Sequence, residues 1–366
     1  MKYALVTVSD SLVNTSMPYN EFAVYRQEHR PDCLHFYIAL FETCVSRTVP
    51  YPEGLAVFRC GGSPRRLRQA MREIREQCSE DGREILVHLH EGKSVLFFRL
   101  AAGPRYRRRT VYTVHSLWPR YSFHNKVFSM LAALISRRTV CVSRTAYEAY
   151  PAVLKRLLKE RITWVRNGAD CGRTDRAGGE GASPAELLRM ICVGRMIPSK
   201  NQAVLLRAVK ENPGCSLTLV GGGAQEEELR ALAGELGIAD RVRFAGYIPR
   251  DEVFREMKRH DLYVSASEYE GLPVSVLEAM CCRIPCAVSD IPSHREIAEQ
   301  CPSLVLAENT EEGWNRVIRG FAGKTPEERK RAGEANREAA ERAFSLERMH
   351  RDYDAVYAAV LQRRQG

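Results

Sequence analysis

The chain has 366 residues, more than one hydrophobic core usually serves, and its 45% hydrophobic and 27% charged residues are ordinary for a soluble globular enzyme, so two domains are expected. No apolar run approaches the roughly 20 residues that span a bilayer, and the first residues, MKYALVTVSD, have the pattern of a buried strand and not of a signal peptide. The twelve cysteines follow no paired spacing, which predicts reduced thiols, no disulfides and a cytoplasmic setting.

The basic residues are concentrated in the first half of the chain. Residues 1–170 contain 27 Lys and Arg against 15 Asp and Glu, a net charge of +12, whereas residues 171–366 contain 28 against 30, a net charge of −2. One interpretation is a solvated, arginine-rich surface. The other is a face for an anionic partner such as membrane phospholipid or a phosphorylated acceptor. Nucleic acid is not expected as a partner, because no recognition motif is present.

Short apolar strands alternate with helical patterns in the first half, which predicts a parallel sheet covered on both faces. The predicted strands are YALVTVS (3–9), CLHFYIAL (33–40), LAVFRC (55–60), EILVHLH (84–90), RTVYTVH (109–115) and RTVCVS (138–143). Residues 63–78 and 122–137 have helical spacing. A stretch rich in Gly, Ser and charge follows, so we expect a first domain at 1–170 and a linker at 171–185.

The second half restarts the same alternation, which predicts a second doubly wound domain at residues 186–345. Its predicted strands are LLRMICVGR (187–195), SLTLVGGG (216–223), RVRFAGY (241–247), DLYVSAS (261–267), PCAVSD (285–290) and PSLVLAE (302–308). The last segment, 346–366, is amphipathic and is expected to form a helix that packs back on the first domain. Two such domains leave a cleft at their strand ends.

The segment EGLPVSVLEAM (Glu270–Met280) sets two carboxylates around a predicted helix start. Pro273 suits the first turn of a helix, which leaves Glu270 in the preceding loop and Glu278 in the second turn, leaning back toward the helix start. The N–H groups near Gly271, Leu272 and Val274 suit an anion. Acids beside an anion site suggest a ligand with phosphate and hydroxyl groups; the alternative is that they only complement the helix dipole.

Several segments carry a family resemblance: VRNGAD, ICVGRMIPSKNQAVLLRAV, LTLVGGG, RVRFAGYIP and DLYVSASEYEGLPVSVLEAMCCRIPCAVSDIPSHREI. Together they resemble the retaining glycosyltransferases of family 4, most closely over residues 164–298. The resemblance implies an α/β protein of the GT-B fold, with two doubly wound Rossmann-like domains facing across a cleft. It gives the first domain to the acceptor and the second to the nucleotide sugar.

The resemblance also implies roles for charged residues of the second domain. It assigns Glu278 to the ribose hydroxyls and Glu270 to the donor sugar. Arg195 and Lys200, in GRMIPSK, match the family's basic pair and would neutralise the donor diphosphate in place of a metal ion; the alternative is two solvated loop cations. The one Asp-x-Asp, Asp352–Asp354, falls in the terminal helix pattern, so neither a metal nor another cofactor is expected.

Histidines end two predicted strands of the first domain. His115, in YTVHS, matches a family histidine near the donor sugar, where it would hydrogen-bond a hydroxyl or stabilise charge. A purely structural histidine is the alternative. His88 and His90, in VHLHEG, are expected to line the cleft.

Two glycine-containing loops match those that approach the nucleotide base, at Gly222 and at Tyr247. The chain departs from the family after the first strand, where many relatives have a Gly-Gly loop near the donor phosphate. Ser9–Val24 stands there instead, with Asn14–Ser16 as candidate hydrogen-bond donors or as part of an unusual acceptor site.

The implied reaction is retaining transfer of a sugar from a UDP- or GDP-linked donor to a glycan or lipid-linked acceptor, in bacterial capsule, exopolysaccharide or lipopolysaccharide synthesis. The resemblance implies a front-face mechanism in which the departing phosphate takes the acceptor proton. The rivals are a catalytically degenerate carbohydrate-binding scaffold, which would suit the altered first loop, and another GT-B enzyme, an epimerase or a phosphorylase. The residues do not fix the base, the donor sugar, the acceptor or the oligomeric state.

The expected location is the cytoplasm, with peripheral attachment to the inner face of the plasma membrane. The basic half contains RYRRR (Arg105–Arg109) and, close by in sequence, the apolar and aromatic segment Ser116–Arg138. Cations beside apolar side chains suit the boundary of an anionic leaflet. The alternative is that this helix packs its apolar side on the sheet and leaves its arginines in water.

Overall fold

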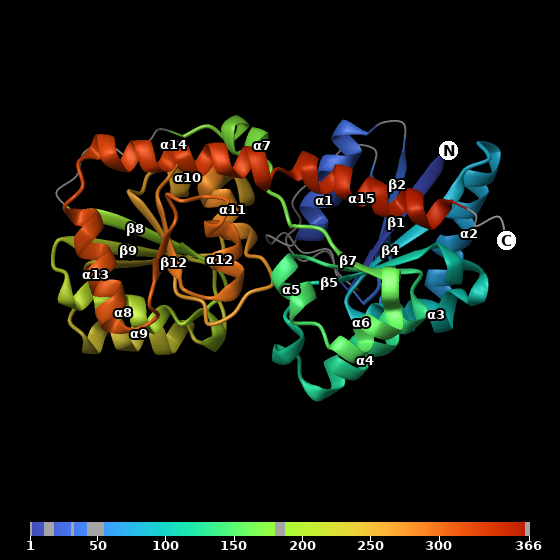
Figure 1. Ribbon diagram of the computed structural model, residues 1–366, viewed down its shortest axis with the longest axis horizontal. Helices are drawn as coiled ribbons and strands as arrows, with labels where there is room; N and C mark the ends of the chain where they lie inside the picture. The colour runs from blue at the N-terminus through green and yellow to red at the C-terminus, as the bar shows by residue number, and fades with distance from the viewer. Residues whose placement is uncertain (1, 11–17, 31–32, 42–54, 180–186, 363–366) are drawn as a thin grey trace. The chain divides into compact units, whose positions relative to one another are not determined.

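The structure, a computed structural model, describes residues 2–10, 18–30, 33–41, 55–179 and 187–362. The chain folds into two compact units (Figure 1). Unit 1 comprises Met1–Asn167 and Leu346–Gly366, and unit 2 comprises Gly168–Ser345. Each unit is built on a parallel sheet flanked by helices, so the predicted α/β class is confirmed.

The sheet of unit 1 has the strand order β3-β2-β1-β4-β5-β6-β7. Every paired strand is parallel. The strands are β1 (Tyr3–Ser9), β2 (Leu34–Ala39), β3 (Ala56–Arg59), β4 (Glu84–His90), β5 (Thr110–Val114), β6 (Arg138–Cys141) and β7 (Ile162–Trp164). The first six lie where the sequence predicted strands. Because the order turns back between β1 and β4, the ends of these two strands flank a crevice where open α/β sheets bind ligands.

The helices of unit 1 include three that helical spacing predicted, at residues 64–80, 123–135 and 346–361, and several that it did not. None of the described helices of either unit combines the length and apolar character needed to cross a bilayer. The helices are α1 (Pro18–His29), α2 (Pro64–Glu80), α3 (Gly92–Ala102), η1 (Pro104–Arg109), η2 (Trp118–Arg120), α4 (Phe123–Ile135), α5 (Arg144–Glu148), α6 (Ala152–Leu158), η3 (Lys159–Arg161) and α15 (Leu346–Leu361).

The C-terminal helix α15 completes the core of unit 1. The side chains of Tyr353 and Tyr357 are buried; the Tyr353 hydroxyl lies 3.0 Å from Thr113 Oγ1 and that of Tyr357 lies 2.7 Å from His88 Nδ1. Since His88 Nε2 also lies 2.7 Å from Thr113 Oγ1, both ring nitrogens are used inside the core. The prediction that His88 lines a cleft is therefore wrong.

The sheet of unit 2 has the strand order β10-β9-β8-β11-β12-β13, again parallel throughout. All six strands were predicted: β8 (Leu188–Val193), β9 (Cys215–Val220), β10 (Val242–Gly246), β11 (Leu262–Ser265), β12 (Cys286–Ser289) and β13 (Val305–Ala307). The helices are α7 (Cys171–Arg176), η4 (Pro198–Lys200), α8 (Gln202–Glu211), α9 (Glu226–Glu235), α10 (Arg250–Lys258), α11 (Val274–Cys281), α12 (Pro292–Ala298), α13 (Glu311–Ala322) and α14 (Pro326–Ala343). Here the order turns back between β8 and β11.

The start of the predicted linker, 171–185, is a helix of unit 2. Helix α7 has Asp170 as its N-cap, whose carboxylate accepts a hydrogen bond from the backbone N–H of Arg173 at 2.9 Å. Cys171 and Thr174 are buried in the unit. The sequence did not reveal this helix for two reasons. Its segment is polar and contains glycine, and its six residues are too few to show a helical period. Residues 180–186 lie outside the described residues.

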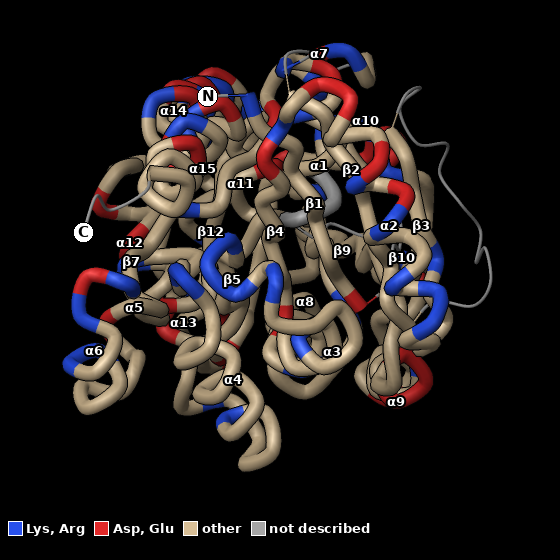
Figure 2. Tube along the Cα trace, turned by 90° about the vertical axis from the view of Figure 1, so that its right-hand side faces the viewer, with Lys and Arg blue, Asp and Glu red and all other residues tan. Residues whose placement is uncertain are grey.

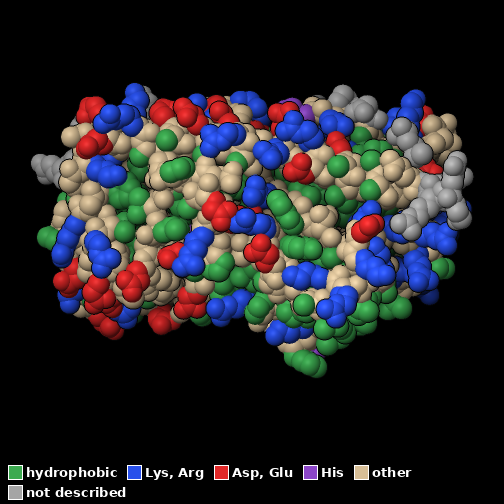
Figure 3. Space-filling view, in the orientation of Figure 1, with side chains coloured by type: hydrophobic (Ala, Val, Ile, Leu, Met, Phe, Trp, Pro, Cys, Tyr) green, Lys and Arg blue, Asp and Glu red, His purple; other side chains and the backbone are tan. Residues whose placement is uncertain are grey.

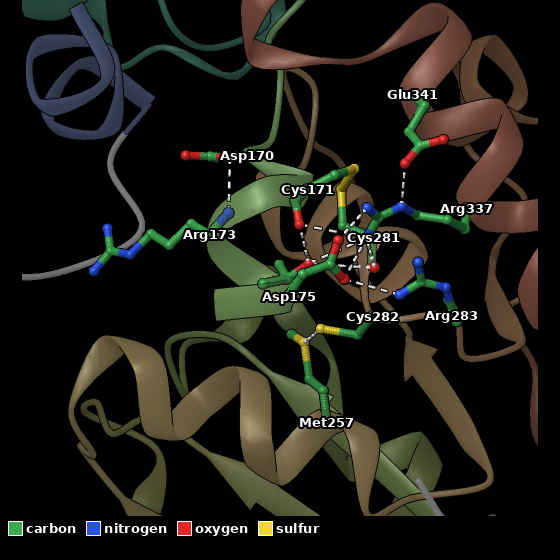
Figure 4. The surroundings of a disulfide bond; sticks show 11 residues. Asp170, Cys171, Arg173, Asp175, Met257, Cys281, Cys282, Arg283, Arg337 and Glu341 are labelled. Carbon is green, nitrogen blue, oxygen red and sulfur yellow. Dashed lines mark hydrogen bonds and ion pairs between the residues drawn. A yellow bond between two sulfur atoms is a disulfide. The ribbon is translucent and has the colours of Figure 1, made fainter. Parts of the chain in front are cut away.

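Cys171 and Cys281 form a disulfide that joins α7 to the end of α11 (Figure 4). The prediction that the thiols are all reduced is wrong for this pair. The two cysteines are separated by 110 residues, so no local spacing could show that their helices pack together. Beside the bond, the Arg337 guanidinium of α14 donates to an Asp175 carboxylate oxygen at 2.6 Å and ties a third helix to the same place.

Candidate active site

Lys200 and Glu270 form an ion pair at the switch point of the unit 2 sheet. Lys200 follows β8 and Glu270 follows β11, the adjacent strands between which the strand order turns back. The backbone joins their loops as well, because the N–H of Glu268 donates to the carbonyl of Ser199 at 2.9 Å. The structure therefore brings together two of the predicted site residues where α/β sheets bind ligands.

The Glu270 carboxyl group is held in its charged form. Burial alone would raise its pKa, but Lys200 and a hydrogen bond from the Ser267 hydroxyl, at 2.7 Å, outweigh burial and hold the pKa below its usual value. Glu270 is thus an ionised carboxylate at neutral pH, able to accept hydrogen bonds from hydroxyl groups.

His294, on α12, lies near this pair and was not predicted. Its Nδ1 donates to the Ser289 carbonyl at 2.7 Å, so Nε2 carries the lone pair. Burial lowers the pKa of His294 to about 4, which leaves a neutral imidazole beside Glu270 and Lys200. It lies in a segment that carries the family resemblance, but only tertiary packing brings it to the site, so the sequence assigned it no role.

A glycine loop fixes the backbone that carries Arg195. Cβ atoms added at Gly221 and Gly223 would lie 2.2 and 2.3 Å from the carbonyl oxygens of Gly194 and Met196. Only glycine permits this approach, and both residues have positive φ, 123° and 159°. The Arg195 side chain is exposed on the surface of the unit, and among the described residues no contact joins it to Lys200 or Glu270.

Gly222 and Tyr247 meet directly. The Tyr247 hydroxyl donates to the Gly222 carbonyl at 3.1 Å, and a Cβ at Gly222 would lie 2.7 Å from the Tyr247 ring. Tyr247 is 70% exposed, so much of its ring is accessible to a planar group. These are the two positions predicted to approach a base.

Helix α11 presents its N-terminus next to Glu270. It begins at Val274. Pro273 was predicted to lie in the first turn, but it is the N-cap residue, one position before that turn. No side chain caps the first turn, which is formed after Gly271 and Leu272 and contains no acid. An eight-residue helix with uncapped N–H groups is suited to an anion.

Glu278, the second predicted acid, is buried and pairs with Arg250 of α10. The side chains of Glu278 and Arg250 are only 3% and 5% exposed. The second carboxylate oxygen, Oε2, is also buried and has no hydrogen-bond partner among the described residues. An unsatisfied buried acceptor is costly, and hydroxyl donors from a ligand would satisfy it. Arg250 was not predicted, since the pair depends on how α10 packs on α11.

In unit 1, His115 lies against His90 at the end of β5. The His90 Nδ1 and His115 Nε2 atoms are 2.9 Å apart. Burial lowers the pKa of His115 to about 4, so it is a neutral hydrogen-bonding group at physiological pH. His115 also lines a pocket with Asp10 and Glu91. The predicted donors Asn14–Ser16 lie outside the described residues.

Metal-binding clusters of three or more His, Cys, Asp or Glu are not found among the described residues. Asp354 of the Asp-x-Asp sequence forms ion pairs with Arg26 and Arg30, each at 2.9 Å. Its carboxylate therefore fixes α15 to α1 within unit 1.

Two protein-family models match the chain. The model of glycosyl transferases group 1 matches residues 179–339, and the model of glycosyltransferase family 4 matches residues 22–173. The first covers the Lys200–Glu270 site and α11. The second covers most of the described part of unit 1.

Curated relatives are similar over part of their length. The chain is 33% identical to a GDP-mannose-dependent α-(1-6)-phosphatidylinositol monomannoside mannosyltransferase of Mycolicibacterium smegmatis over 107 residues, 26% of this chain and 28% of the relative. It is 33% identical over 124 residues to the lipopolysaccharide core biosynthesis glycosyltransferase LpsE of Rhizobium meliloti, 33% of this chain and 35% of the relative. An α-1,3-galactosyltransferase of Escherichia coli that uses UDP-Gal is 26% identical over 232 residues, 56% and 58% of the two chains. The chain thus spans about a quarter to just over half of these relatives.

Solved structures match nearly the whole fold. Sucrose-phosphate synthase from Thermosynechococcus elongatus superposes with a TM-score of 0.78 at 15% identity, covering 98% of this chain and 99% of that one. HepE from Anabaena, in complex with UDP-glucose, superposes with a TM-score of 0.76 at 17% identity, covering 97% and 99%. With both units matched by family models and the whole fold shared with such enzymes, the chain belongs to glycosyltransferase family 4 and has the GT-B fold.

Proposed function

We propose that the chain is a retaining glycosyltransferase that moves a sugar from a UDP- or GDP-linked donor to a glycan or lipid-linked acceptor in bacterial surface-polysaccharide synthesis. The observation that carries this proposal is the Lys200–Glu270 pair beside the uncapped start of α11. The relatives named for lipopolysaccharide core synthesis and for UDP-Gal transfer support the pathway and the class of donor.

In this proposal each group of unit 2 has a separate task. The N–H groups at the start of α11, with Lys200 and Arg195, hold the diphosphate and the charge that grows on it as the glycosidic bond breaks. Glu270 accepts hydrogen bonds from donor-sugar hydroxyls. Oε2 of Glu278 accepts them from ribose, and Tyr247 stacks on the base. The departing phosphate takes the acceptor proton on the same face, so no metal or protein base is needed.

A panel of nucleotide sugars tests the proposal. We expect at least one UDP- or GDP-sugar to raise the midpoint of thermal unfolding, because a ligand that binds only the native state stabilises it. The same compound should be hydrolysed slowly to the nucleoside diphosphate. If no nucleotide sugar stabilises the protein or is hydrolysed, the proposal fails and a carbohydrate-binding scaffold is favoured. Release of sugar phosphate from a glycan without any nucleotide would instead indicate a phosphorylase.

We further propose that unit 1 docks on an anionic membrane surface. Large apolar side chains are exposed on three of its helices: Leu100 on α3, Phe123 on α4 and Leu157 on α6 are 88%, 77% and 60% exposed. Figure 3 shows hydrophobic and basic side chains gathered along the lower edge of this unit. The apolar side of α4 is therefore only partly used for packing on the sheet, which favours the membrane interpretation over a merely solvated surface.

The cations beside these residues are crowded. Arg107, Arg137 and Arg138 lower the pKa of Arg161, after the larger effect of burial, and Arg107 likewise lowers that of Arg99. Figure 2 shows the basic segments beside β5 and on α6 in blue. Like charges gathered in this way are relieved by an anionic partner such as phospholipid headgroups.

Vesicle binding tests the docking proposal. Arg105, Arg107 and Arg108 are exposed, whereas Arg109 pairs with Glu84 at 2.9 Å and is left unchanged. Changing the three exposed arginines to serine should weaken binding to phosphatidylglycerol vesicles by about 3 kcal/mol at low salt, on the order of 10²-fold, since each cation is worth about 1 kcal/mol.

The matched control removes three exposed cations of unit 2, through Lys210→Ser, Lys330→Ser and Arg331→Ser, and should bind vesicles as the wild type does. Equal losses in the two triple variants would show that only net charge matters. A wild type that ignores anionic vesicles at low salt would favour a soluble acceptor.

A further inference from the structure

Two side chains donate to the same oxygen of the Glu270 carboxylate. Lys200 Nζ and the Ser267 hydroxyl both bind Oε1, the hydroxyl at 2.7 Å. Among the described residues, no hydrogen bond or ion pair engages the second oxygen, Oε2, and the side chain is partly exposed. The carboxylate is thus divided into one oxygen that the protein holds and one that is available to hydroxyl groups of a ligand.

The two donors to Oε1 differ in how firmly they are held. Lys200 is a partly exposed ammonium on a flexible four-carbon stem, and the proposed function also assigns it to the donor diphosphate. Ser267 is fully buried and has a short side chain. When Lys200 turns toward a bound diphosphate, the hydrogen bond from Ser267 is the one that Oε1 keeps.

The segment that carries Ser267 follows β11 and is fixed from the next two strands of the sheet. Ser289, at the end of β12, donates to the carbonyl of Ser267 at 2.5 Å. Asn309, after β13, donates to the Ala266 carbonyl at 3.0 Å and accepts a hydrogen bond at 3.0 Å from the indole of the buried Trp314. Two consecutive carbonyls are therefore held by separate side chains, which fixes the position of the Ser267 hydroxyl.

We propose that Ser267 is a positioning residue for sugar transfer, which holds Oε1 of Glu270 so that Oε2 faces the donor sugar. Ser267 touches neither the substrate nor the reacting atoms and acts through Glu270. The proposal rests on the proposed glycosyltransferase function and adds a residue that the site requires. A second buried serine, Ser265, is not equivalent: its hydroxyl lies 3.3 Å from that of Ser267 and, among the described residues, is not bonded to Glu270.

The Ser267→Ala variant should lower the turnover of donor hydrolysis or transfer by on the order of tenfold, because a hydrogen bond to a charged group is lost. Binding of the free nucleoside diphosphate should be nearly unchanged, since Glu270 is assigned to the sugar. Ser265→Ala is the matched control. It removes a buried hydroxyl at the end of the same strand but leaves the hydrogen bond to Glu270 in place, so its turnover should stay close to that of the wild type.

The pH profile of turnover separates positioning from a structural role. Glu270 acts as a carboxylate, so turnover should fall as acid protonates it. The Ser267 hydroxyl is one of the groups that lower the pKa of Glu270. Its removal raises that pKa, and the fall in turnover should therefore begin at a higher pH in Ser267→Ala. The profile of Ser265→Ala should coincide with that of the wild type.

Other titratable groups beside Glu270 are Lys200 of η4, His294 of α12, Cys192 of β8 and Tyr263 of β11. Burial lowers the pKa of His294 to about 4, raises that of Cys192 to about 12 and raises that of Tyr263 as well. His294 titrates in the acid range of a carboxyl group, but it is present in both serine variants. A difference between their profiles therefore reports the hydrogen bond to Glu270.

A double-mutant cycle shows whether the serine acts through the glutamate. In a Glu270→Ala background, Ser267→Ala should cause no further loss of turnover, because the carboxylate that the hydroxyl orients is absent. Fully additive losses would overturn the proposal, as would a Ser267→Ala profile that coincides with that of the wild type.

Circular dichroism and the unfolding midpoint show whether Ser267→Ala is folded. Ser267→Cys provides the test if it is not, because the thiol is similar in size and is a weak donor. Its turnover should be lower than that of the wild type, with the acid fall again at higher pH, and wild-type behaviour in both would overturn the proposal. A wild type that neither binds nor hydrolyses a nucleotide sugar would reject the proposed function as well, whereas an active wild type with an unshifted Ser267→Ala profile would reject only the role of Ser267.

Discussion

Replacing Lys200 by alanine is expected to lower the turnover of sugar transfer by on the order of 10²-fold or more, because a cation that stabilises the charge of the transition state is lost. The lysine pairs with Glu270 at the switch point and stands beside the start of α11. Its loss removes a cation from the diphosphate site and leaves the Glu270 carboxylate, 15% exposed, without its main partner. Steady-state kinetics with the best donor of the panel measure the effect.

Two comparisons make this result specific. Lys210→Ala, an exposed lysine on α8 of the same unit, should leave turnover unchanged, and Lys200→Arg should restore part of it. Arg195→Ala should also cost on the order of 10²-fold if its exposed side chain folds onto the bound diphosphate. Excess chelator should have no effect on the wild type. Full activity in Lys200→Ala, or activity that disappears with chelator and returns with manganese, would show that the charge is stabilised in another way.

Replacing Glu278 by alanine is expected to destabilise unit 2 by about 3–5 kcal/mol, the usual result of removing one partner of a buried ion pair. Both side chains are nearly inaccessible, so Arg250 would be left charged and uncompensated. The same variant should also bind free nucleoside diphosphate more weakly, because the acceptor proposed for ribose is gone. Chemical denaturation and calorimetry measure the two effects.

The double variant Glu278→Ala with Arg250→Met distinguishes stability from binding. It removes the uncompensated charge and should recover part of the lost stability, whereas nucleotide binding should stay weak. Glu270→Ala should give the opposite pattern, with slower turnover and nearly unchanged binding of the nucleoside diphosphate. Glu235→Ala, an exposed acid on α9, should change stability by less than about 0.5 kcal/mol. A Glu278→Ala variant that binds the diphosphate normally would contradict the ribose assignment.

The strands were predictable because most of them are apolar runs bounded by turn residues, which is the pattern of a strand buried on both faces. Strand β7 was not predicted because it is three residues long, with Trp164 partly exposed. Helix α3 was not predicted for a different reason. Its apolar residues surround the helix, with Leu100 exposed and Phe98 buried, so no amphipathic period appears.

The site was predictable only as far as local sequence decides it. Lys200, Glu270 and the start of α11 lie in recognisable segments, and the fold brings them together as the strand order requires. Arg250 and His294 reach the site through helix packing, and the Cys171–Cys281 bond joins residues 110 positions apart. Such partners depend on tertiary contacts, and one sequence carries no local signal for them.

The return of α15 to unit 1 sets the order in which the protein can be completed on the ribosome. Unit 1 is interrupted after Asn167 and resumes only at Leu346, once all of unit 2 has been made. At roughly 5–20 residues per second, these about 180 intervening residues delay the last helix by roughly 10 to 40 s. During that interval the core positions around Leu86 and Val111 lack the side chains of Tyr353 and Tyr357 that cover them. The unit that begins first is therefore finished last, and the unfinished core of unit 1 stays exposed while unit 2 is synthesised.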